Sequence, residues 1–233
     1  MFFNLSSNNP CLLCDTPTSE NTLVCKDCFV DFPQIKNACY QCALPLHQYA
    51  ESSQKTQICG NCLNQPPSFD YTLAAFLYAQ PLDYLIRQFK FSAQLVTGHA
   101  LAKLMLKVID TDVTGTPESI IPVPLHRNKL KSRGYNQAQE LAHPIAKSLN
   151  INADLITCAR IKDTQAQSGL TKKERIKNVK NAFELNRSIS AEHVILLDDI
   201  MTTGNTLNEL AKQLKKAGVK TVGIWVCARA VID

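Results

Sequence analysis

The chain has 233 residues and an apolar share of 45%, which allows a packed core larger than that of one small domain. No apolar run approaches the roughly 18 residues of a membrane-spanning helix, and the N-terminus lacks the basic and long apolar stretches of a secretory signal. We therefore expect a cytoplasmic protein with no membrane span. Residues 1–70 carry three lysines and six acids, a net charge of −3, which leaves +8 for the rest of a chain whose total is +5. The C-terminal part is thus expected to face an anion.

Eight of the ten cysteines form four Cys-x-x-Cys pairs near the N-terminus. In a reducing compartment such clustering indicates metal binding rather than disulfides. Two pairs supply the four thiolates of a structural zinc site, and iron–sulfur clusters are the alternative. Pairing neighbours along the chain closes the shortest loops and is preferred, while a cross-braced arrangement is chemically allowed. The predicted ligands of two structural sites are Cys11, Cys14, Cys25, Cys28, Cys39, Cys42, Cys59 and Cys62.

The acidic charge of the cysteine-rich part argues against binding to a phosphate backbone, which needs lysines and arginines. We interpret this part as a scaffold or a platform for protein docking. Pro66 and Pro67 interrupt any helix or strand and mark a boundary. The predicted modules are residues 1–68, a double zinc ribbon, and residues 69–233. Cys158 and Cys227 stand apart from the pairs and are interpreted as small buried apolar residues.

Strands and helices are predicted to alternate after the boundary. Apolar runs favour strands at 71–79, 120–123, 193–197 and 222–227, with another within 151–160. Apolar residues at helical spacing favour a helix at 95–109, and Pro81 suits the first turn of a helix at 81–89. Further helices are expected at 136–149, 206–216 and the charged, helix-prone stretch 171–180. Pro144 is expected to kink or restart the third helix. This alternation predicts an α/β fold with a parallel, doubly wound sheet, whose ligand lies beyond the carboxyl ends of the strands.

The most informative segment follows the predicted strand at 193–197. Two carboxylates, Asp198 and Asp199, precede a short loop of small and hydroxyl-bearing residues that leads into a helix. Backbone N–H groups and the dipole at a helix N-terminus favour a phosphate, and the carboxylates suit ribose hydroxyls, directly or through Mg²⁺. A tight turn with solvated acids is the plainer alternative. The predicted binding residues are Asp198, Asp199, Thr202, Thr203, Gly204, Asn205 and Thr206.

Residues 194–206 resemble the signature of type I phosphoribosyltransferases that binds 5-phosphoribosyl 1-pyrophosphate (PRPP). In that family the two acids bind the ribose 2′ and 3′ hydroxyls, and the loop binds the 5′-phosphate. Some purine-using members carry an aspartate where this chain has Thr202, so the resemblance does not imply purine chemistry. Residues 122–126 (PVPLH), residues 133–137 (RGYNQ) and the Cys-x-x-Cys pairs resemble the ComF family of competence proteins (ComFC/GntX-like). So does a spaced set of residues comprising Arg160, Thr164, Gln167, Leu170, Arg175 and Asn178.

Basic residues concentrate in two further segments, a predicted loop after the strand at 120–123 and a segment that ends in the helix predicted at 171–180. Residues 127–133 hold four cations and no acid, and residues 160–180 hold seven basic residues and two acids. The resemblance places a pyrophosphate-binding loop in the first and a mobile lid in the second. Both could equally serve a nucleic-acid backbone or an exposed basic surface. The predicted contacts are Pro124, His126, Arg127, Arg133, Arg160, Gln167 and Arg175, with Asp198, Asp199 and Arg133 as catalytic candidates.

The resemblance implies a PRPP-binding protein of natural transformation that uses Mg²⁺ with PRPP and two structural Zn²⁺ ions. The resemblance does not imply that transfer is catalysed, and it identifies no acceptor. One alternative is a factor that handles single-stranded DNA through the same phosphate site. Another is a non-catalytic sensor of PRPP or a nucleotide, which docks a competence helicase or another competence protein through the zinc module.

Overall fold

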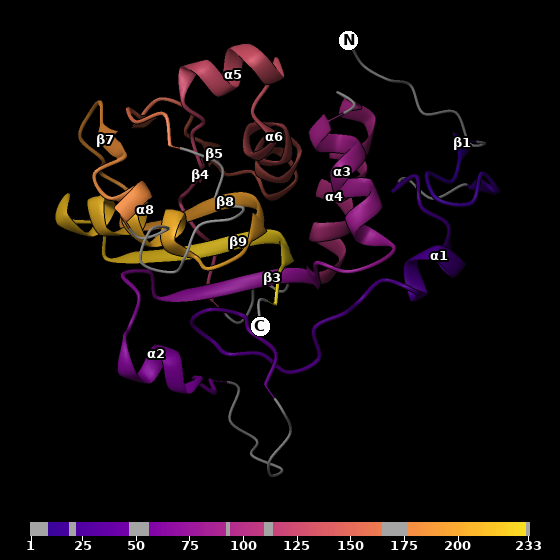
Figure 1. Cartoon of the computed structure of the whole chain (residues 1–233), viewed down its shortest axis with the longest axis horizontal. Helices are drawn as coiled ribbons and strands as arrows, with labels where there is room; N and C mark the ends of the chain where they lie inside the picture. Colours follow the sequence, from indigo (N-terminus) through magenta and orange to yellow (C-terminus); the bar gives the residue numbers. More distant parts are fainter. Residues whose placement is uncertain are drawn as a thin grey trace.

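The computed structural model describes residues 9–18, 22–46, 56–91, 94–109, 114–164 and 177–231. Its centre is a sheet of five parallel strands in the order β3–β9–β8–β4–β5 (Figure 1). The strands are β3 (Tyr71–Leu77), β4 (Ser119–Pro122), β5 (Asn152–Ala153), β8 (His193–Met201) and β9 (Thr221–Arg229). The parallel α/β class predicted from the sequence is confirmed.

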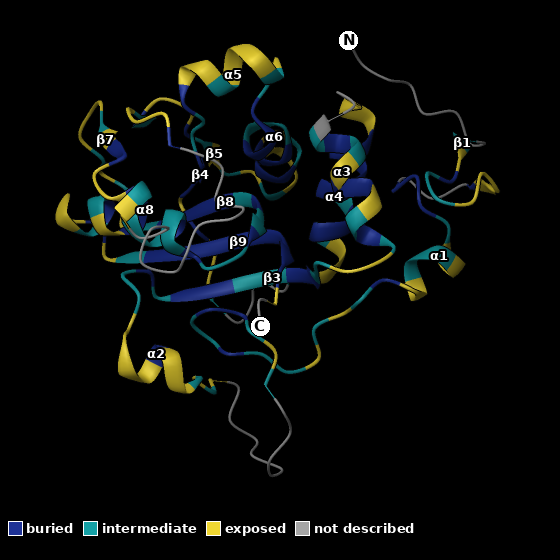
Figure 2. Cartoon of the chain, viewed as in Figure 1, coloured by how far each residue is buried: buried dark blue, intermediate teal, exposed yellow. Residues whose placement is uncertain are grey.

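Helices cover both faces of this sheet, which is why its strands are apolar throughout. Within β8, Ile195 and Leu197 belong to one buried core, and Val194 and Leu196 belong to the other. Figure 2 shows the central strands buried between their covering layers. The first core is closed by α3 (Leu82–Phe91), α4 (Leu95–Val108) and α6 (Gln137–Leu149), and the second by α8 (Asn205–Lys216). Helix α6 continues through Pro144 without a restart.

Strand β8 is longer than its apolar run predicts. We expected the strand to end at Leu197, but its pairing with β9 continues through Asp198 and Met201. The partner strand β9 extends equally far, so backbone hydrogen bonds between the two strands continue β8 past the apolar run and through the polar residues. Asp198 and Asp199 therefore stand on the last part of the strand, and the loop begins after it.

The basic segment after β4, predicted as a loop, is the short helix α5 (Arg127–Arg133). His126 caps it, because its Nδ1 accepts a hydrogen bond from the N–H of Asn128 at 3.3 Å, and Gly134 ends it at a φ of 86°. His126 is only 9% exposed and is therefore buried. The expected strand within 151–160 is divided into β5 and β6 (Cys158–Arg160), and β6 pairs antiparallel with β7 (Phe183–Leu185).

The N-terminal module contains β1 (Asn9–Pro10), β2 (Pro17–Thr18), α1 (Lys26–Val30) and α2 (Gly60–Asn64). It runs along the β3 edge of the sheet (Figure 1). Thr72 and Leu77 of β3 donate backbone hydrogen bonds to the carbonyls of Tyr40 and Pro33, at 3.0 and 2.8 Å. The module thereby satisfies an edge that would otherwise be open to pairing with another chain. The predicted division at 68–69 lies between α2 and β3 and stays a prediction.

The eight paired cysteines form two groups of four, and in each group the sulfur atoms lie within 4.8 Å of one another. The groups are Cys11, Cys14, Cys25 and Cys28, and Cys39, Cys42, Cys59 and Cys62, so the preferred pairing of neighbours is confirmed. Four converging sulfur ligands fit a structural zinc ion. The two groups also pack into the two cores of the sheet. None of the described helices is long and apolar enough to cross a membrane.

Candidate functional site

A cavity of about 310 Å³ lies beyond the carboxyl ends of β4 and β8. This is the edge at which parallel sheets bind ligands. Its walls come from α3, the β4–α5 connection, α5, the start of α6, β6, the end of β8 and the segment that leads into α8. The lining residues are Lys90, Val123, Leu125, Lys129, Arg133, Asn136, Gln137, Ala138, Arg160 and every residue from Asp198 to Leu207.

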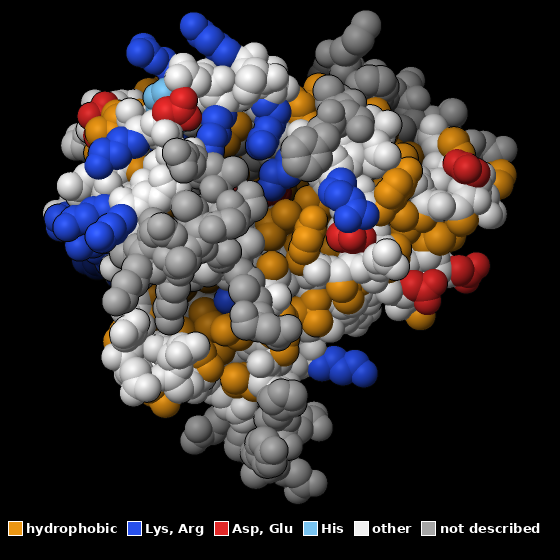
Figure 3. Space-filling model, in the orientation of Figure 1, with side chains coloured by type: hydrophobic (Ala, Val, Ile, Leu, Met, Phe, Trp, Pro, Cys, Tyr) orange, Lys and Arg blue, Asp and Glu red, His pale blue; other side chains and the backbone are white. Residues whose placement is uncertain are grey.

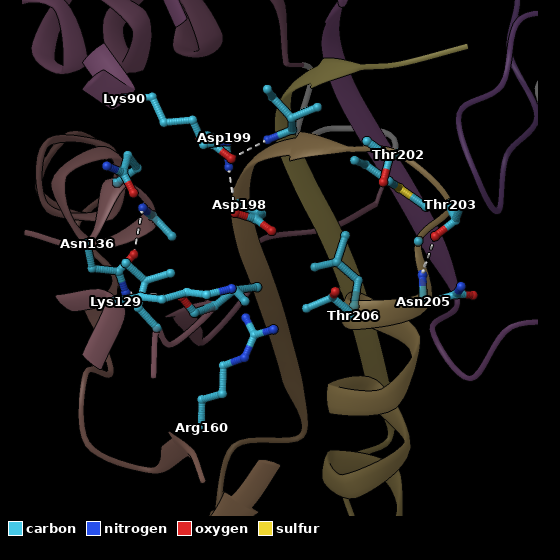
Figure 4. Close-up of a pocket in the computed structure, with 18 of the residues that line it drawn as sticks. Lys90, Lys129, Asn136, Arg160, Asp198, Asp199, Thr202, Thr203, Asn205 and Thr206 are labelled. Carbon is cyan, nitrogen blue, oxygen red and sulfur yellow. Dashed lines mark hydrogen bonds and ion pairs between the residues drawn. The ribbon is translucent and has the colours of Figure 1, made fainter. Parts of the chain in front are cut away.

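The segment from β8 into α8 forms one wall of the cavity (Figure 4). Gly204 has a φ of 75° and precedes the first residue of α8. The N–H of Asn205 is held by the hydroxyl of Thr203 at 3.4 Å, and the side-chain amide nitrogen of Asn205 is buried without a hydrogen-bond partner. A helix N-terminus with donors of this kind favours an anion.

The two carboxylates lie between this loop and α3 (Figure 4). Lys90 of α3 forms an ion pair with Asp199 at 2.9 Å, and Asp199 is 5% exposed. Desolvation and the charge of Asp199 raise the pKa of Asp198 to about 7, although Lys90 and Arg160 oppose this shift. Burial disfavours the charge of Lys90, but Asp199 and Asp198 outweigh it and raise the pKa of Lys90. Asp198 therefore changes its charge near neutral pH.

The wall opposite the loop is cationic. Lys129 and Arg160 extend across the cavity towards the loop (Figure 4), and Arg133 is held by Gln137 through a hydrogen bond of 2.8 Å. Burial, followed by the charge of Arg160, lowers the pKa of Lys129, and burial also lowers the pKa of Arg160. Both shifts indicate cations that lack enough negative charge around them. A bound polyanion would supply that charge.

The structure brings most of the predicted site residues to this cavity. Asp198, Asp199, Arg133, Arg160 and all five predicted loop residues line it. Among the described residues, Pro124, His126 and Arg127 are not part of its lining. His126 instead caps α5 and approaches Asp163 at 3.5 Å. The predicted contacts Gln167 and Arg175, like most of the predicted helix at 171–180, lie outside the described residues.

Sequence reasoning missed the role of three lining residues. Lys90 reaches the acids from α3, far away in the chain, and no local pattern marks it. Asn136 caps α6 and also donates to the carbonyl of Val123 at 3.0 Å. The side-chain nitrogen of Gln137 is buried without a partner. Asn136 and Gln137 belong to the RGYNQ string, so that string could have indicated them.

Replacing Gly204 is predicted to reduce stability for two separable reasons. An added Cβ would lie 2.6 Å from the Cε of Met201, which is 2% exposed, and the φ of 75° is itself strained for alanine. Gly218, at a φ of 97°, has open space around its Cβ position. We expect Gly218→Ala to lose about 1 kcal/mol of unfolding free energy and Gly204→Ala to lose about 1 kcal/mol more, because the end of the flexible but buried Met201 side chain must move; urea unfolding measures both losses. Equal losses would show that the Met201 contact is unimportant.

Comparison with known proteins identifies both parts of the chain. A family model described as a phosphoribosyl transferase domain matches residues 132–231, and one described as a double zinc ribbon domain matches residues 7–63. The "Competence protein F" of Haemophilus influenzae is 41% identical over 199 residues, covering 82% of this chain and 84% of that protein. The "DNA utilization protein YhgH" of Salmonella typhimurium is 32% identical over 226 residues, covering 95% and 97%.

Among solved structures, an adenine phosphoribosyltransferase matches 63% of this chain and 75% of its own, with 12% identity and a TM-score of 0.36. The matching family models and the two relatives agree with the resemblance seen in the cysteine pairs and in residues 194–206. The chain belongs to the ComF/YhgH family, in which a phosphoribosyltransferase domain follows an N-terminal double zinc ribbon.

Proposed function

We propose that this chain binds PRPP in the cavity at the end of β8 and acts in the uptake or use of DNA. The observation that carries the proposal is the division of one cavity into three parts, with a loop at a helix N-terminus, a pair of acids and a cationic wall. These parts correspond to the phosphate, the ribose and the pyrophosphate of PRPP. The printed names of the relatives, a competence protein and a DNA utilization protein, support the cellular role.

The loop would bind the 5′-phosphate. Backbone N–H groups at the start of α8 and the hydroxyls of Thr202, Thr203 and Thr206 are donors of the kind that phosphate oxygens require. The unpartnered amide of Asn205 supplies another donor nearby. Gly204 lets the backbone approach the ligand closely because no side chain intervenes.

Asp198 and Asp199 would accept hydrogen bonds from the ribose hydroxyls. Their carboxylate oxygens are also ligands that Mg²⁺ prefers, and we propose that Mg²⁺ enters with PRPP and is held here. When bound, it would neutralise charge on the pyrophosphate. Lys90 keeps the pair partly neutralised before the ligand arrives.

Lys129, Arg133 and Arg160 would hold the pyrophosphate. If transfer occurs, the bond from ribose C1 to the pyrophosphate oxygen breaks, and the oxygen leaves with the electron pair. An acceptor then bonds to C1 on the opposite face. Cations preorganised at the departing group stabilise the charge that develops there. Thr202 stands where some relatives of this domain carry an acid, so we propose no purine acceptor and assign no general base.

Displacement of labelled PRPP by its parts tests this assignment. Ribose 5-phosphate and pyrophosphate should each displace the label, because each fills one half of the cavity, whereas ribose alone should displace little. Equal displacement by pyrophosphate and by triphosphate, with none by ribose 5-phosphate, would instead indicate a general anion site and overturn the proposal.

Lys90 is predicted to set the pH at which PRPP binds best. Binding should strengthen as the pH rises through about 7, because Asp198 then loses its proton and becomes a better acceptor. Lys90→Met removes a cation that holds the pKa of Asp198 down, so the midpoint should move upward by about one pH unit. Arg87→Met, which removes an exposed cation of the same helix, is the matched control and should leave the midpoint unchanged. Ionisation of the phosphate groups of PRPP also changes binding with pH, but it affects the wild type and both variants equally and so does not alter the comparison. An unchanged midpoint in Lys90→Met would contradict this prediction.

We also propose that each cysteine group holds one zinc ion. The four sulfur atoms of each group leave no position for water, so these ions would be structural. The double zinc ribbon match supports zinc over an iron–sulfur cluster. Zinc analysis of the purified chain should give two ions, and an iron content with visible absorption would contradict the assignment. The remaining surface of the module is available to dock a partner protein.

Single-strand DNA binding is a second candidate, favoured by the orientation of α5. Lys129 and Arg133 line the cavity, whereas Arg127 and Lys131 of the same helix are exposed outside it. Figure 3 shows Lys and Arg side chains gathered on the side of the molecule where α5 and α8 lie. A chain of phosphates could therefore continue from the cavity onto this surface.

Arg127→Ala/Lys131→Ala should weaken salt-dependent binding of single-stranded DNA and leave PRPP binding intact, because both cations lie outside the cavity lining. Each lost phosphate contact should also flatten the dependence of log affinity on log salt concentration by about 0.7. DNA binding that is insensitive to salt, or to this double substitution, would exclude this surface.

A further inference from the structure

Arg229, at the end of β9, is a buried arginine whose side chain is only 4% exposed. Its Nε donates to the carbonyl of Cys42 at 2.7 Å. Its Nη1 donates to the carbonyls of Met201 at 3.1 Å, Thr202 at 2.5 Å and Ala230 at 2.5 Å. One side chain therefore joins the second cysteine group to the first residues of the candidate phosphate loop.

The hydrogen bond from Arg229 to Cys42 reaches the turn between Cys39 and Cys42, two candidate metal ligands of the second group. Cys42 ends this turn, and the hydroxyl of Thr72 on β3 holds it independently by donating to the carbonyl of Gln41 at 2.5 Å. Four thiolates around one zinc ion carry a net charge of about −2. Such a group compensates a buried guanidinium, which would otherwise be costly to keep away from water. Without the zinc ion the four sulfur atoms would no longer be held at one point, so the carbonyl of Cys42 would lose the anchor that keeps it in place for Arg229.

On the loop side, Arg229 fixes the direction of peptide groups that face the cavity. The carbonyl of Thr202 points to Arg229, and in a planar trans peptide the following N–H, that of Thr203, points the opposite way. The Met201 side chain packs beneath the loop, with its Cε close to Gly204. Met201 shares a buried core with Cys42 and Cys62, so the loop and the second group rest on the same packing.

The first cysteine group lacks this connection. Its most buried member, Cys11, packs in the other core, with Phe76 and the residues of α3 and α4. Among the described residues, no hydrogen bond joins this group to residues 198–206. The two groups therefore differ in their relation to the site, although their ligand sets are alike.

We propose that Arg229 is a positioning residue that couples the second cysteine group to the phosphate loop. Zinc bound by Cys39, Cys42, Cys59 and Cys62 holds Arg229 in place, and Arg229 holds the loop in the shape that accepts a phosphate. Zinc in the first group has no such effect. The consequence for PRPP rests on the proposed function, whereas the coupling between zinc and loop shape does not. Because such coupling is reciprocal, PRPP should also slow the loss of zinc from the second group only.

Methionine-methyl NMR of the full chain tests the coupling without any ligand. The chain has three methionines, of which Met201 reports on the loop and Met105, in the other core, serves as an internal reference. Cys59→Ser should shift or broaden the Met201 signal and leave Met105 unchanged, while Cys14→Ser in the first group should change neither. Arg229→Leu should alter Met201 in the same way as Cys59→Ser, and combining the two should add little.

Two further variants keep the test decisive. Thr72→Val removes a hydrogen bond to Gln41 in the same turn but leaves the zinc ligands and the contact of Arg229 with Cys42 intact, so it should leave the Met201 signal in place. If Arg229→Leu does not fold, Arg229→Lys takes its place, because lysine retains the charge but cannot reach all four carbonyls. A Met201 signal unmoved by Cys59→Ser would overturn the proposal. So would a zinc effect that is as large in the Arg229 variant as in the wild type.

A second arm measures PRPP affinity in the same proteins. It should fall about tenfold in Cys59→Ser and in the Arg229 variant, and stay unchanged in Cys14→Ser. If PRPP binds none of the proteins but Met201 still responds to Cys59→Ser and Arg229, the proposed function is wrong and the coupling stands. If PRPP binds all of them equally and Met201 does not respond, the coupling is wrong and the proposed function stands.

Discussion

Asp198→Asn/Asp199→Asn is expected to weaken PRPP binding about 100-fold or more. Each carboxylate offers charged acceptors to the ribose hydroxyls or to Mg²⁺, and losing a hydrogen bond to a charged group weakens binding by about 1.5–3 kcal/mol. Calorimetric titration of PRPP measures the loss. Asp70→Asn is the matched control, because this carboxylate accepts a hydrogen bond from the N–H of Val222 near the start of β9, at the opposite end of the sheet. If the double variant binds PRPP as tightly as the control does, Asp198 and Asp199 do not contribute to PRPP binding.

The Asp198 carboxylate should also reduce stability at alkaline pH. Its pKa in the folded chain, about 7, lies above the ordinary value of 3.8, so the folded state binds the proton more tightly than the unfolded state. The resulting stability is fully present below about pH 4 and is lost as the pH rises through about 7. Asp198→Asn alone should therefore leave the unfolding free energy at pH 8 unchanged or higher. Residues kept for binding often carry such a cost.

The second large effect concerns zinc. Cys39→Ser is expected to remove one of the two proposed ions and to lower the unfolding free energy by several kcal/mol, because binding energy in a structural zinc site is folding energy. Cys39 is buried and shares a core with Val226 and Leu196 of the sheet, so the loss should spread beyond the N-terminal module. Urea unfolding and zinc analysis measure the two effects.

Cys158→Ser provides the comparison for this experiment. Cys158 is also buried in the second core but belongs to neither cysteine group. Its replacement should lower stability only by about 1–3 kcal/mol, the effect of burying a hydroxyl, and should leave the zinc content at two. If Cys39→Ser and Cys158→Ser behave alike, the cysteine groups do not hold structural metal.

Features that are local in the sequence could be predicted. The Cys-x-x-Cys spacing predicts the metal ligands because two residues between thiolates suffice to direct both at one ion. The string at 194–206 predicts a strand, a loop and a helix in order, and the structure places all of its polar residues in one cavity. These predictions depend on neighbours within the same short segment.

Features that depend on tertiary contacts could not be predicted. Lys90 is one of several polar residues on α3, and nothing in its local sequence distinguishes it from the others. Only the packing of α3 against the sheet brings it to Asp199. Arg229 ends an apolar strand, at a position where a charged residue is usually exposed to solvent. In the structure it is buried and donates a hydrogen bond to Cys42 of the N-terminal module. Helix α5 was missed because its basic residues lack an apolar stripe, and its capping by His126 is visible only in the structure.

The most direct test of the account is a calorimetric titration of PRPP, with Mg²⁺ present, into the zinc-loaded full chain and into Asp198→Asn/Asp199→Asn. We expect saturable binding of one PRPP per chain, lost in the variant. No binding to the intact chain, or equal binding to both proteins, would contradict the assignment of this cavity to a phosphoribosyl ligand.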